Sequence, residues 1–522
     1  MDDEVAVSSD EDSAEASALL RPHAAVAKRL EYGRGGRATL NLLSVATITY
    51  FSVSGGPFGL EIAVAAGGPA AVIALLLVLC ALWSLPCALM TAELSSALPS
   101  RAGYMHWVSR AIGPGAGAIN GWLSLLGSAV DSSTYPAIFC DYTVFAMQHW
   151  GGTPLLPRDR VLLSGVLTLV MLLLNLRGIT LAARASIILA IFSLAPFALM
   201  LLLFLFQSPV ASFAAFRTVL TAGVPKPDIP LLLSVVLWST SGFDAVSLVS
   251  SEVSSPKTIP RAMMLSLVMV LASTLVPILV CCMAEKGHLK TWAAFDIGSF
   301  SSAAERLGGS WLGVWTCAAG MSACAGLLNS FMVTSARGVQ AMAMRSMLPA
   351  RLRDEYGSEE TPVPALLFTF LCINLCLVLP FQESPRAIAR CLLQKPPPSH
   401  LHRPPPPQEL IELDMALYTL SLALELLSLL RLRWTEPHLP RPYRVPLGRC
   451  ALVLAYLPCL CLCATMVIVS LRTWKMCAAW FAILSSGYAL HVFGPYVFNS
   501  SSKKSSDPLL NGHVQEERDE SA

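Results

Sequence analysis

The chain has 522 residues, of which 54% are hydrophobic and 13% are charged, and its formal net charge is +2. The charged share is about half of that in an ordinary soluble domain, and a mean hydropathy of +0.60 agrees with it. This composition excludes a soluble multidomain protein. Because no basic face interleaved with aromatic residues is evident, it also argues against a nucleic-acid partner.

A polar, acidic and serine-rich segment, residues 1–38, precedes the first apolar run and is expected to be disordered. Apolar runs of roughly 20 residues then recur, each long enough to cross the hydrocarbon core as a helix. The predicted spans are 41–66, 69–97, 115–140, 161–176, 185–206, 230–251, 262–283, 310–335, 364–381, 409–430, 449–471 and 476–498. We therefore predict an all-α membrane protein with about twelve transmembrane helices, followed by a polar tail, residues 499–522.

The distribution of Lys and Arg over the predicted loops indicates the orientation. Loops that lie inside when the N-terminus is cytoplasmic carry more of these residues than the outer loops do. We therefore expect both termini in the cytoplasm and the protein in the plasma membrane. Residues 15–20 read EASALL, an acidic dileucine pattern, which leaves an endosomal or vacuolar membrane as the alternative.

A Pro-rich segment, residues 383–408, separates the ninth and tenth predicted spans. Proline removes a helical N–H donor and stops a helix from continuing, so we predict an extended linker inserted between two helices. A functional insertion and an artefact of the gene model both stay open.

Two predicted spans are interrupted by helix-breaking residues. Residues 54–59 read SGGPFG in the first span, and residues 239–244 read STSGFD in the sixth. Such breaks at membrane depth are stable only when they are buried or line a cavity. Their positions predict two inverted five-helix repeats, 39–206 and 230–430, which meet near the midplane. Residues 449–498 would then form two additional helices.

The predicted spans contain carboxylates but no Lys or Arg near their centres. A charged side chain at the bilayer centre costs roughly 3 kcal/mol on insertion scales, so each acid must face a cavity, carry a proton or bind a cation. Glu61, Asp131 and Asp244 are therefore the candidates for cation binding and for proton coupling. Asp244 lies inside the second break, where capping the following helix is the alternative role. Glu61 begins a half-helix, where an acid also suits the helix dipole.

Acids near the ends of two spans suggest ion pairs. Glu252 opens the loop after the sixth span, and we expect it to form an inner gate with Lys257 or Arg261. Glu93, near the end of the second span, is expected to contact the loop that contains Arg101.

Several strings resemble the amino acid/polyamine/organocation superfamily, and most closely the polyamine uptake transporters of plants and protists, relatives of L-type amino acid transporters. The matching strings are VSGGPFGLE (53–61), TAELSSALPSRAGYMHWVSRAIGPGAGAINGW (91–122), VDSSTYPAIFCDY (130–142), FDAVSLVSSEVSSPKTIPRAM (243–263), GVQAMAMRSMLP (338–349) and RPYRVPLG (441–448). The resemblance implies the twelve-helix fold with a five-plus-five repeat and alternating access. It also implies proton-driven uptake of polyamines or cationic amino acids.

Two departures from the family pattern bear on the substrate. Gly242 and Phe243 stand where the resemblance leads us to expect an aromatic pair, and the eighth span carries Asn329 where an acid is expected. A neutral or L-type amino acid carrier, an exchanger and a sensor that does not transport therefore stay as alternatives. A sodium site that includes Thr334 and Ser335 is the alternative to proton symport.

The resemblance implies that spans one, three, six and eight contact the substrate. The substrate-binding candidates are Ser54, Gly55, Gly56, Phe58, Gly59, Glu61, Asp131, Tyr135, Ser241, Gly242, Phe243, Asp244 and Asn329. We expect no cofactor, no metal site and no enzymatic activity, because the nine His residues are scattered and no catalytic groups converge. The expected partners are a small cationic substrate, protons and membrane lipid, and the sequence does not identify a partner subunit.

Overall fold

The computed structural model describes residues 40–151, 156–207, 217, 224, 226–284, 292–378, 408–471 and 474–498. The two predicted tails, the dileucine pattern and residues 383–407 of the Pro-rich segment lie outside the described residues.

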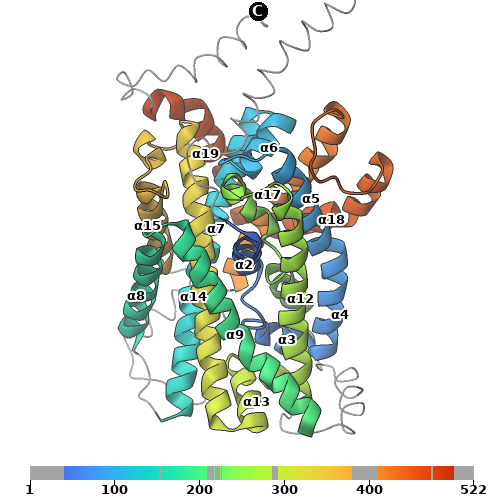
Figure 1. The fold of residues 1–522 in the computed structure, drawn as a ribbon, viewed down its shortest axis with the longest axis vertical. Helices are drawn as coiled ribbons and strands as arrows, with labels where there is room; N and C mark the ends of the chain where they lie inside the picture. The colour runs from blue at the N-terminus through green and yellow to red at the C-terminus, as the bar shows by residue number, and fades with distance from the viewer. Residues whose placement is uncertain are drawn as a thin grey trace, which may run out of the picture.

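The described residues form a bundle in which most long helices follow the long axis of the molecule (Figure 1). Its helices are α2 (Leu42–Val53), α3 (Glu61–Gly67), α4 (Pro69–Leu79), η1 (Cys80–Ser84), α5 (Leu85–Ala97), α6 (Tyr104–Ala111), α7 (Pro114–His149), α8 (Pro157–Asn175), α9 (Ile179–Gln207), α11 (Ile229–Trp238), η2 (Phe243–Glu252), α12 (Thr258–Ala284), η3 (Trp292–Ala294), α13 (Ser299–Gly308), α14 (Ser310–Met344), η4 (Ala350–Arg353), α15 (Val363–Val378), α17 (Gln408–Thr435), α18 (Arg449–Ser470) and α19 (Trp474–Phe498).

Eight segments within the described residues are long and apolar enough to cross a membrane as helices. They are Pro69–Ala97, Ile179–Phe206, Ile229–Glu252, Thr258–Ala284, Ser310–Met344, Asp414–Thr435, Arg449–Ile468 and Trp480–Phe498. α7 and α8 are long helices outside this set, and Leu42–Val53 and Val363–Leu377 are shorter apolar ones. The predicted all-helical fold is observed, while the count of twelve spans and the inverted repeat remain predictions.

Both helix interruptions lie where the sequence predicted them. Residues 54–60 separate α2 from α3, and residues 239–242 separate α11 from η2. The second half of the sixth predicted span is a 3-10 helix rather than an α-helix. α14 packs against α2 and η2, α17 packs against α11, and α7 packs against both α14 and α17.

A buried ion cluster joins α5 to the end of α17 and the segment that follows it. The Glu93 carboxylate accepts hydrogen bonds from Arg433 Nε at 2.6 Å and Arg433 Nη2 at 2.5 Å. Arg441 Nε lies 3.1 Å from Glu93 Oε1, and the Val445 N–H donates to Glu93 Oε2 at 2.9 Å. Both Glu93 and Arg433 are fully buried. The cluster therefore holds two elements together without exposing a charge.

The expectation that Glu93 contacts the loop of Arg101 is wrong. Arg101 pairs instead with Glu355 at 2.5 Å and Glu360 at 2.6 Å. The partner of Glu93 comes from α17, 340 residues along the chain, so adjacency in sequence could not identify it.

We predict that Arg433→Met destabilises the protein, because it leaves the buried Glu93 carboxylate with less of its neutralising charge. Removing one partner of a buried ion pair costs about 3–5 kcal/mol of folding stability. The measurement is chemical or thermal unfolding of the detergent-purified protein. Arg431→Met is the matched control, since Arg431 lies on the same helix and is exposed. Equal stability of the two variants would contradict a structural role for the cluster.

Candidate functional site

A pocket lies where the two interrupted helices meet α7, α14 and α17. Its empty volume is about 660 Å³, which includes the space at its mouth that is open to solvent. The lining residues are Ser52, Val53, Tyr104, Leu123, Ser124, Gly127, Ser128, Asp131, Tyr135, Trp238, Ser241, Gly242, Asp244, Ala245, Leu248, Phe331, Thr334, Asp414, Met415, Tyr418 and Ser421. Its wall thus combines hydroxyls, aromatic rings and carboxylates.

The second helix break touches the end of α2, just before the first break, at the wall of this pocket. A Cβ atom on Gly242 would lie 2.2 Å from Ser52 O, and Gly242 has a φ of 111°, so only glycine suits this position. The π-helical turn η1 supports the break: Trp83 Nε1 donates to Ser241 Oγ at 3.0 Å, and Ser84 Oγ donates to a carbonyl of the same break at 3.0 Å. These contacts supply partners for polar groups that lipid could not satisfy.

Asp131 of α7 is held at the pocket by two aromatic side chains. Its Oδ2 accepts from Tyr135 Oη at 2.6 Å, and its Oδ1 accepts from Trp238 Nε1 at 2.8 Å. The rings of Tyr135 and Trp238 stack with their centroids 6.2 Å apart and an interplanar angle of 22°. The carboxylate is therefore fixed in position and joins α7 to α11.

Asp244 of η2 is held from α17. Tyr418 Oη donates to Asp244 Oδ1 at 2.7 Å and accepts from the Gly242 N–H at 2.9 Å. One tyrosine hydroxyl thus satisfies a break amide and orients the acid of the same break.

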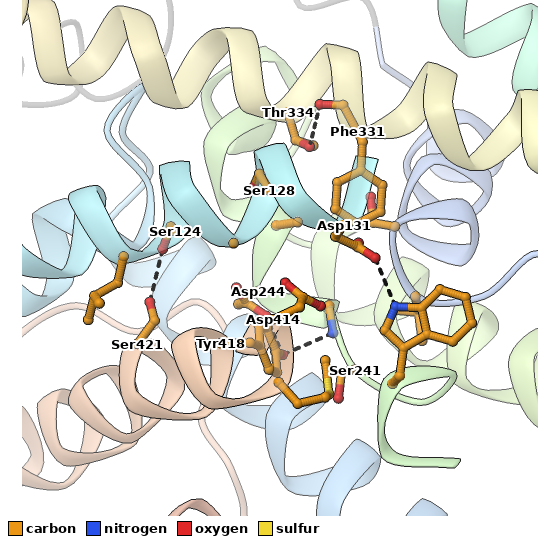
Figure 2. Close-up of a pocket in the computed structure, with 18 of the residues that line it drawn as sticks. Ser124, Ser128, Asp131, Ser241, Asp244, Phe331, Thr334, Asp414, Tyr418 and Ser421 are labelled. Carbon is orange, nitrogen blue, oxygen red and sulfur yellow. Dashed lines mark hydrogen bonds between the residues drawn. The ribbon is translucent and has the colours of Figure 1, made fainter. Parts of the chain in front are cut away.

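Asp414 is the third carboxylate of the pocket, and Figure 2 labels it together with Asp131 and Asp244 among the lining residues, each on a different element. It is only 5% exposed, and no described residue donates a hydrogen bond to its carboxylate. Gly127 of α7 lies beside it, and a Cβ there would be in ordinary van der Waals contact, 3.4 Å from Asp414 Oδ1. The lining residues include three carboxylates and neither Lys nor Arg. The pocket is therefore suited electrostatically to a cation.

Five predicted binding residues line this pocket together: Asp131, Tyr135, Ser241, Gly242 and Asp244. Eight others do not line it: Ser54, Gly55, Gly56, Phe58, Gly59, Glu61, Phe243 and Asn329. From the first break, the pocket is lined instead by Ser52 and Val53 at the end of α2. The glycines of the first break pack against neighbours, as at Gly55, where a Cβ would lie 2.7 Å from Leu327 Cδ1.

Glu61 and Phe58 lie in a separate buried region. Glu61 is fully buried and accepts from Tyr142 Oη at 2.7 Å and from the Gly59 N–H at 2.8 Å. Phe58 packs edge-on against Tyr142, with centroids 5.4 Å apart, and tilted against Phe197 at 5.3 Å. Glu61 thus ties the break of the first span to α7.

Asn329 and Phe243 have packing and hydrogen-bonding roles in the structure. Asn329 Nδ2 donates to Ala182 O and Ser186 Oγ, both at 2.9 Å, and its Oδ1 accepts from Asn175 Nδ2 at 2.8 Å. This joins α14 to α8 and α9. Phe243 is fully buried.

Three important residues of the pocket were absent from the predicted set: Trp238, Asp414 and Tyr418. Asp414 and Tyr418 are four residues apart on α17, so they share one face of a helix. That spacing is present in the sequence, but it does not show which helix α17 packs against, and Asp414 reaches the pocket through the packing of α17 against α7.

At the proposed gate, Glu252 pairs with an arginine that the sequence did not suggest. Arg337 of α14 forms a bidentate pair with Glu252, with Nη2 to Oε2 at 3.0 Å, in place of the expected pairing with Lys257. Beside it, Leu40 pairs with Val253 as an isolated parallel β bridge. Glu252 thus ties the end of η2 to α14.

A sequence model described as amino acid permease matches residues 40–497 of the chain. A probable polyamine transporter of Arabidopsis thaliana is 29% identical over 456 residues, covering 87% of this chain and 83% of the relative. A polyamine transporter of Oryza sativa subsp. japonica is 31% identical over 455 residues, covering 87% and 77%. The large neutral amino acids transporter small subunit 2 of Homo sapiens is 23% identical over 377 residues, covering 69% and 63%. All of these relatives are named as transporters.

We predict that Gly242→Ala destabilises the protein by about 1–3 kcal/mol, since it strains the backbone and forces the added methyl against Ser52 O. Unfolding of the purified variant measures this cost. The control is Gly165→Ala on α8, where no atom lies within 4 Å of the added Cβ, so we expect no loss. A Gly242 variant as stable as the Gly165 variant would refute the close contact between the second break and the end of α2.

Proposed function

Because the chain belongs to the amino acid permease family, as its sequence motifs predicted, we propose that it imports polyamines or cationic amino acids by secondary active transport. Membership of this family, with relatives named as transporters, makes the chain a multi-pass membrane transporter rather than an enzyme. The observation that carries the substrate proposal is the pocket with Asp131, Asp244 and Asp414 and no lining Lys or Arg.

The chemistry of the pocket favours an ammonium group over a neutral one. Asp414 accepts no hydrogen bond from the described residues, so a bound ammonium would supply the donor and the counter-charge that it lacks. Trp238 and Phe331 add aromatic rings to the wall, and a cation placed over the face of such a ring gains roughly 0.5–2 kcal/mol. The two named relatives with the greater identity are polyamine transporters.

The amides at the breaks support a substrate without a carboxylate. In half-helix sites, free N–H groups hold the carboxylate of an amino acid. Here the Gly242 N–H donates to Tyr418 Oη, the Gly59 N–H to Glu61, and the Gly56 N–H to Ser54 Oγ at 3.2 Å. Of the three glycines, Gly242 lines the pocket, and its amide is already paired with Tyr418, which supports a polyamine over an amino acid within the proposed class.

A neutral amino acid remains the second candidate, since one relative is named a large neutral amino acids transporter. Only a measurement of substrate flux across the membrane distinguishes a carrier from a sensor of the same fold that does not transport.

We further propose that residues 39–206 and 230–430 act as two inverted repeats that alternate access to the pocket, with residues 449–498 as additional helices. Transport is proton-coupled in this proposal, with Glu61, Asp131 and Asp244 as the candidate carriers, and Glu252 acts as an inner gate. In this proposal the protein lies in the plasma membrane, and both of its termini face the cytoplasm.

We predict that Asp244→Asn and Asp414→Asn each raise the half-saturating concentration for putrescine about 10-fold to 100-fold, because each removes a charged hydrogen-bond acceptor worth about 1.5–3 kcal/mol. Uptake of radiolabelled putrescine into proteoliposomes measures this. Asp354→Asn is the control of identical chemistry, since Asp354 is exposed and outside the pocket. Unchanged uptake by both pocket variants would exclude these acids from the site.

A competition panel tests the substrate class and the coupling ion. We expect spermidine and putrescine to compete more strongly than arginine, and arginine more strongly than leucine, because the pocket offers negative charge without a cationic partner. A protonophore is expected to abolish accumulation, and sodium removal to leave it intact. Preferential competition by leucine would favour the neutral amino acid carrier, and loss of uptake on sodium removal alone would exclude proton coupling.

A further inference from the structure

The pocket follows the contact between two helices that run in opposite directions. The hydroxyl of Ser124 on α7 lies 2.9 Å from that of Ser421 on α17 (Figure 2), and Gly127 lies beside Asp414. Residue numbers therefore rise along α7 where they fall along α17. Asp414 and Ser421 both line the pocket and are seven residues apart, which is about 10 Å along a helix. The pocket thus extends over about two helical turns.

The two ends of this pocket differ in chemistry. At one end, here called the acidic end, Asp131 and Asp414 line the wall, and the charge of Asp131 acts on Asp414. At the other, here called the hydroxyl end, Ser124 and Ser421 line it. Asp131 is seven residues from Ser124 on α7, so both helices place an acid and a hydroxyl at the same spacing.

Asp244 supplies a second centre of negative charge in the same pocket. It accepts a hydrogen bond from Tyr418, which lies on α17 between Asp414 and Ser421. Its charge also acts on Glu425, a fully buried acid whose carboxylate accepts from Ser421 Oγ at 3.4 Å. Asp244 is therefore displaced from the acidic end toward the hydroxyl end.

Asp414 is the acid of the pocket that lacks a donor. Asp131 accepts hydrogen bonds from two aromatic side chains, whereas Asp414 accepts none from the described residues and is only 5% exposed. An ionised carboxylate can accept at about four lone-pair sites, and burying it without donors is costly. An ammonium at the acidic end would donate N–H groups to Asp414 and balance its charge.

Charge and shape together favour two ammonium groups on one chain. A single ammonium at the acidic end leaves Asp244 without a counter-charge, because no Lys or Arg is among the lining residues. Phe331 and Met415 add an apolar wall, against which methylene groups can pack. Asp414 and Tyr418, which holds Asp244, are one helical turn apart, or about 6 Å along the axis. The two nitrogens of an extended four-carbon diamine have a similar separation.

We propose that the pocket binds a linear polyamine lengthwise between α7 and α17, with one ammonium at Asp131 and Asp414 and the next at Asp244. Asp414 is then the residue that selects substrates with two or more ammonium groups over those with one. This inference rests on the proposed function, because it requires a cationic substrate in this pocket, and it adds the orientation of that substrate and the residue that counts its charges.

The test is competition against radiolabelled putrescine for binding to the full-length purified protein. The competitors are butylamine, which has the same four-carbon chain and one ammonium, and linear diamines of three to eight carbons. We expect the wild-type protein to bind putrescine about 10-fold to 100-fold more tightly than butylamine, because the second ammonium adds a charged hydrogen bond. Among the diamines we expect a single affinity maximum, because the two subsites are fixed in the protein.

Asp414→Asn tests the residue assigned to the second subsite. We expect this variant to lose the preference for putrescine over butylamine and to keep most of its affinity for butylamine, because a monoamine can bind at Asp244. Asp414→Glu retains the charge and is expected to restore the preference. Asp354→Asn is the control of identical chemistry and should change neither affinity, since Asp354 is exposed and outside the pocket.

The outcomes separate this inference from the proposed function. Equal affinity of the wild type for putrescine and butylamine, or an affinity that rises steadily with diamine length, overturns the two subsites and leaves the cation carrier intact. An equal loss of both amines in Asp414→Asn overturns the role of Asp414. If that variant fails to fold, the diamine series on the wild type still decides. Failure of the wild type to bind putrescine, spermidine and arginine refutes the proposed function, and this inference with it.

Discussion

The approach of Gly242 to the Ser52 carbonyl is the contact on which the pocket depends. Backbone groups freed at a helix break have no water to bond with at membrane depth, so each break must find partners within the protein. Here the second break packs against the end of α2, accepts a hydrogen bond from Ser84 of η1 at a backbone carbonyl, and donates the Gly242 N–H to Tyr418 of α17. Meeting these backbone requirements also places Asp244 at the wall of the pocket.

The same residue type has opposite roles in two parts of this bundle. Glu93 is buried against two arginines, and Glu252 is paired with Arg337, so both acids join elements together. The carboxylates of the pocket and Glu425 have no such arginine among the described residues. Where the protein supplies the counter-charge, an acid stabilises structure. Where it does not, the acid is free to respond to a substrate ammonium or to a proton.

The helix α17 carries an acid that lines the pocket and an arginine that neutralises a buried acid. Asp414 and Tyr418 face the pocket, Glu425 lies behind Ser421, and Arg433 anchors the far end of the helix to Glu93. A displacement of this helix would therefore change the pocket wall and the buried cluster around Glu93 together.

The sequence by itself determined the helical membrane fold, the two interruptions and the family. These are local properties: apolar runs set the length of a helix, and Gly and Pro stop it wherever they occur. Asp131 and Asp244 were also identified from sequence, because a carboxylate within an apolar run is conspicuous without any knowledge of its neighbours.

Only the tertiary structure decided which acids share a cavity and which are neutralised. Asp414 joins the pocket through packing of α17 against α7, and Glu93 is paired with an arginine 340 residues away. The glycine-rich first break, the most conspicuous motif in the chain, contributes packing and hydrogen bonds, while the end of α2 contributes to the pocket wall. Charge compensation depends on side chains brought together from distant elements, and spacing along the chain does not record it.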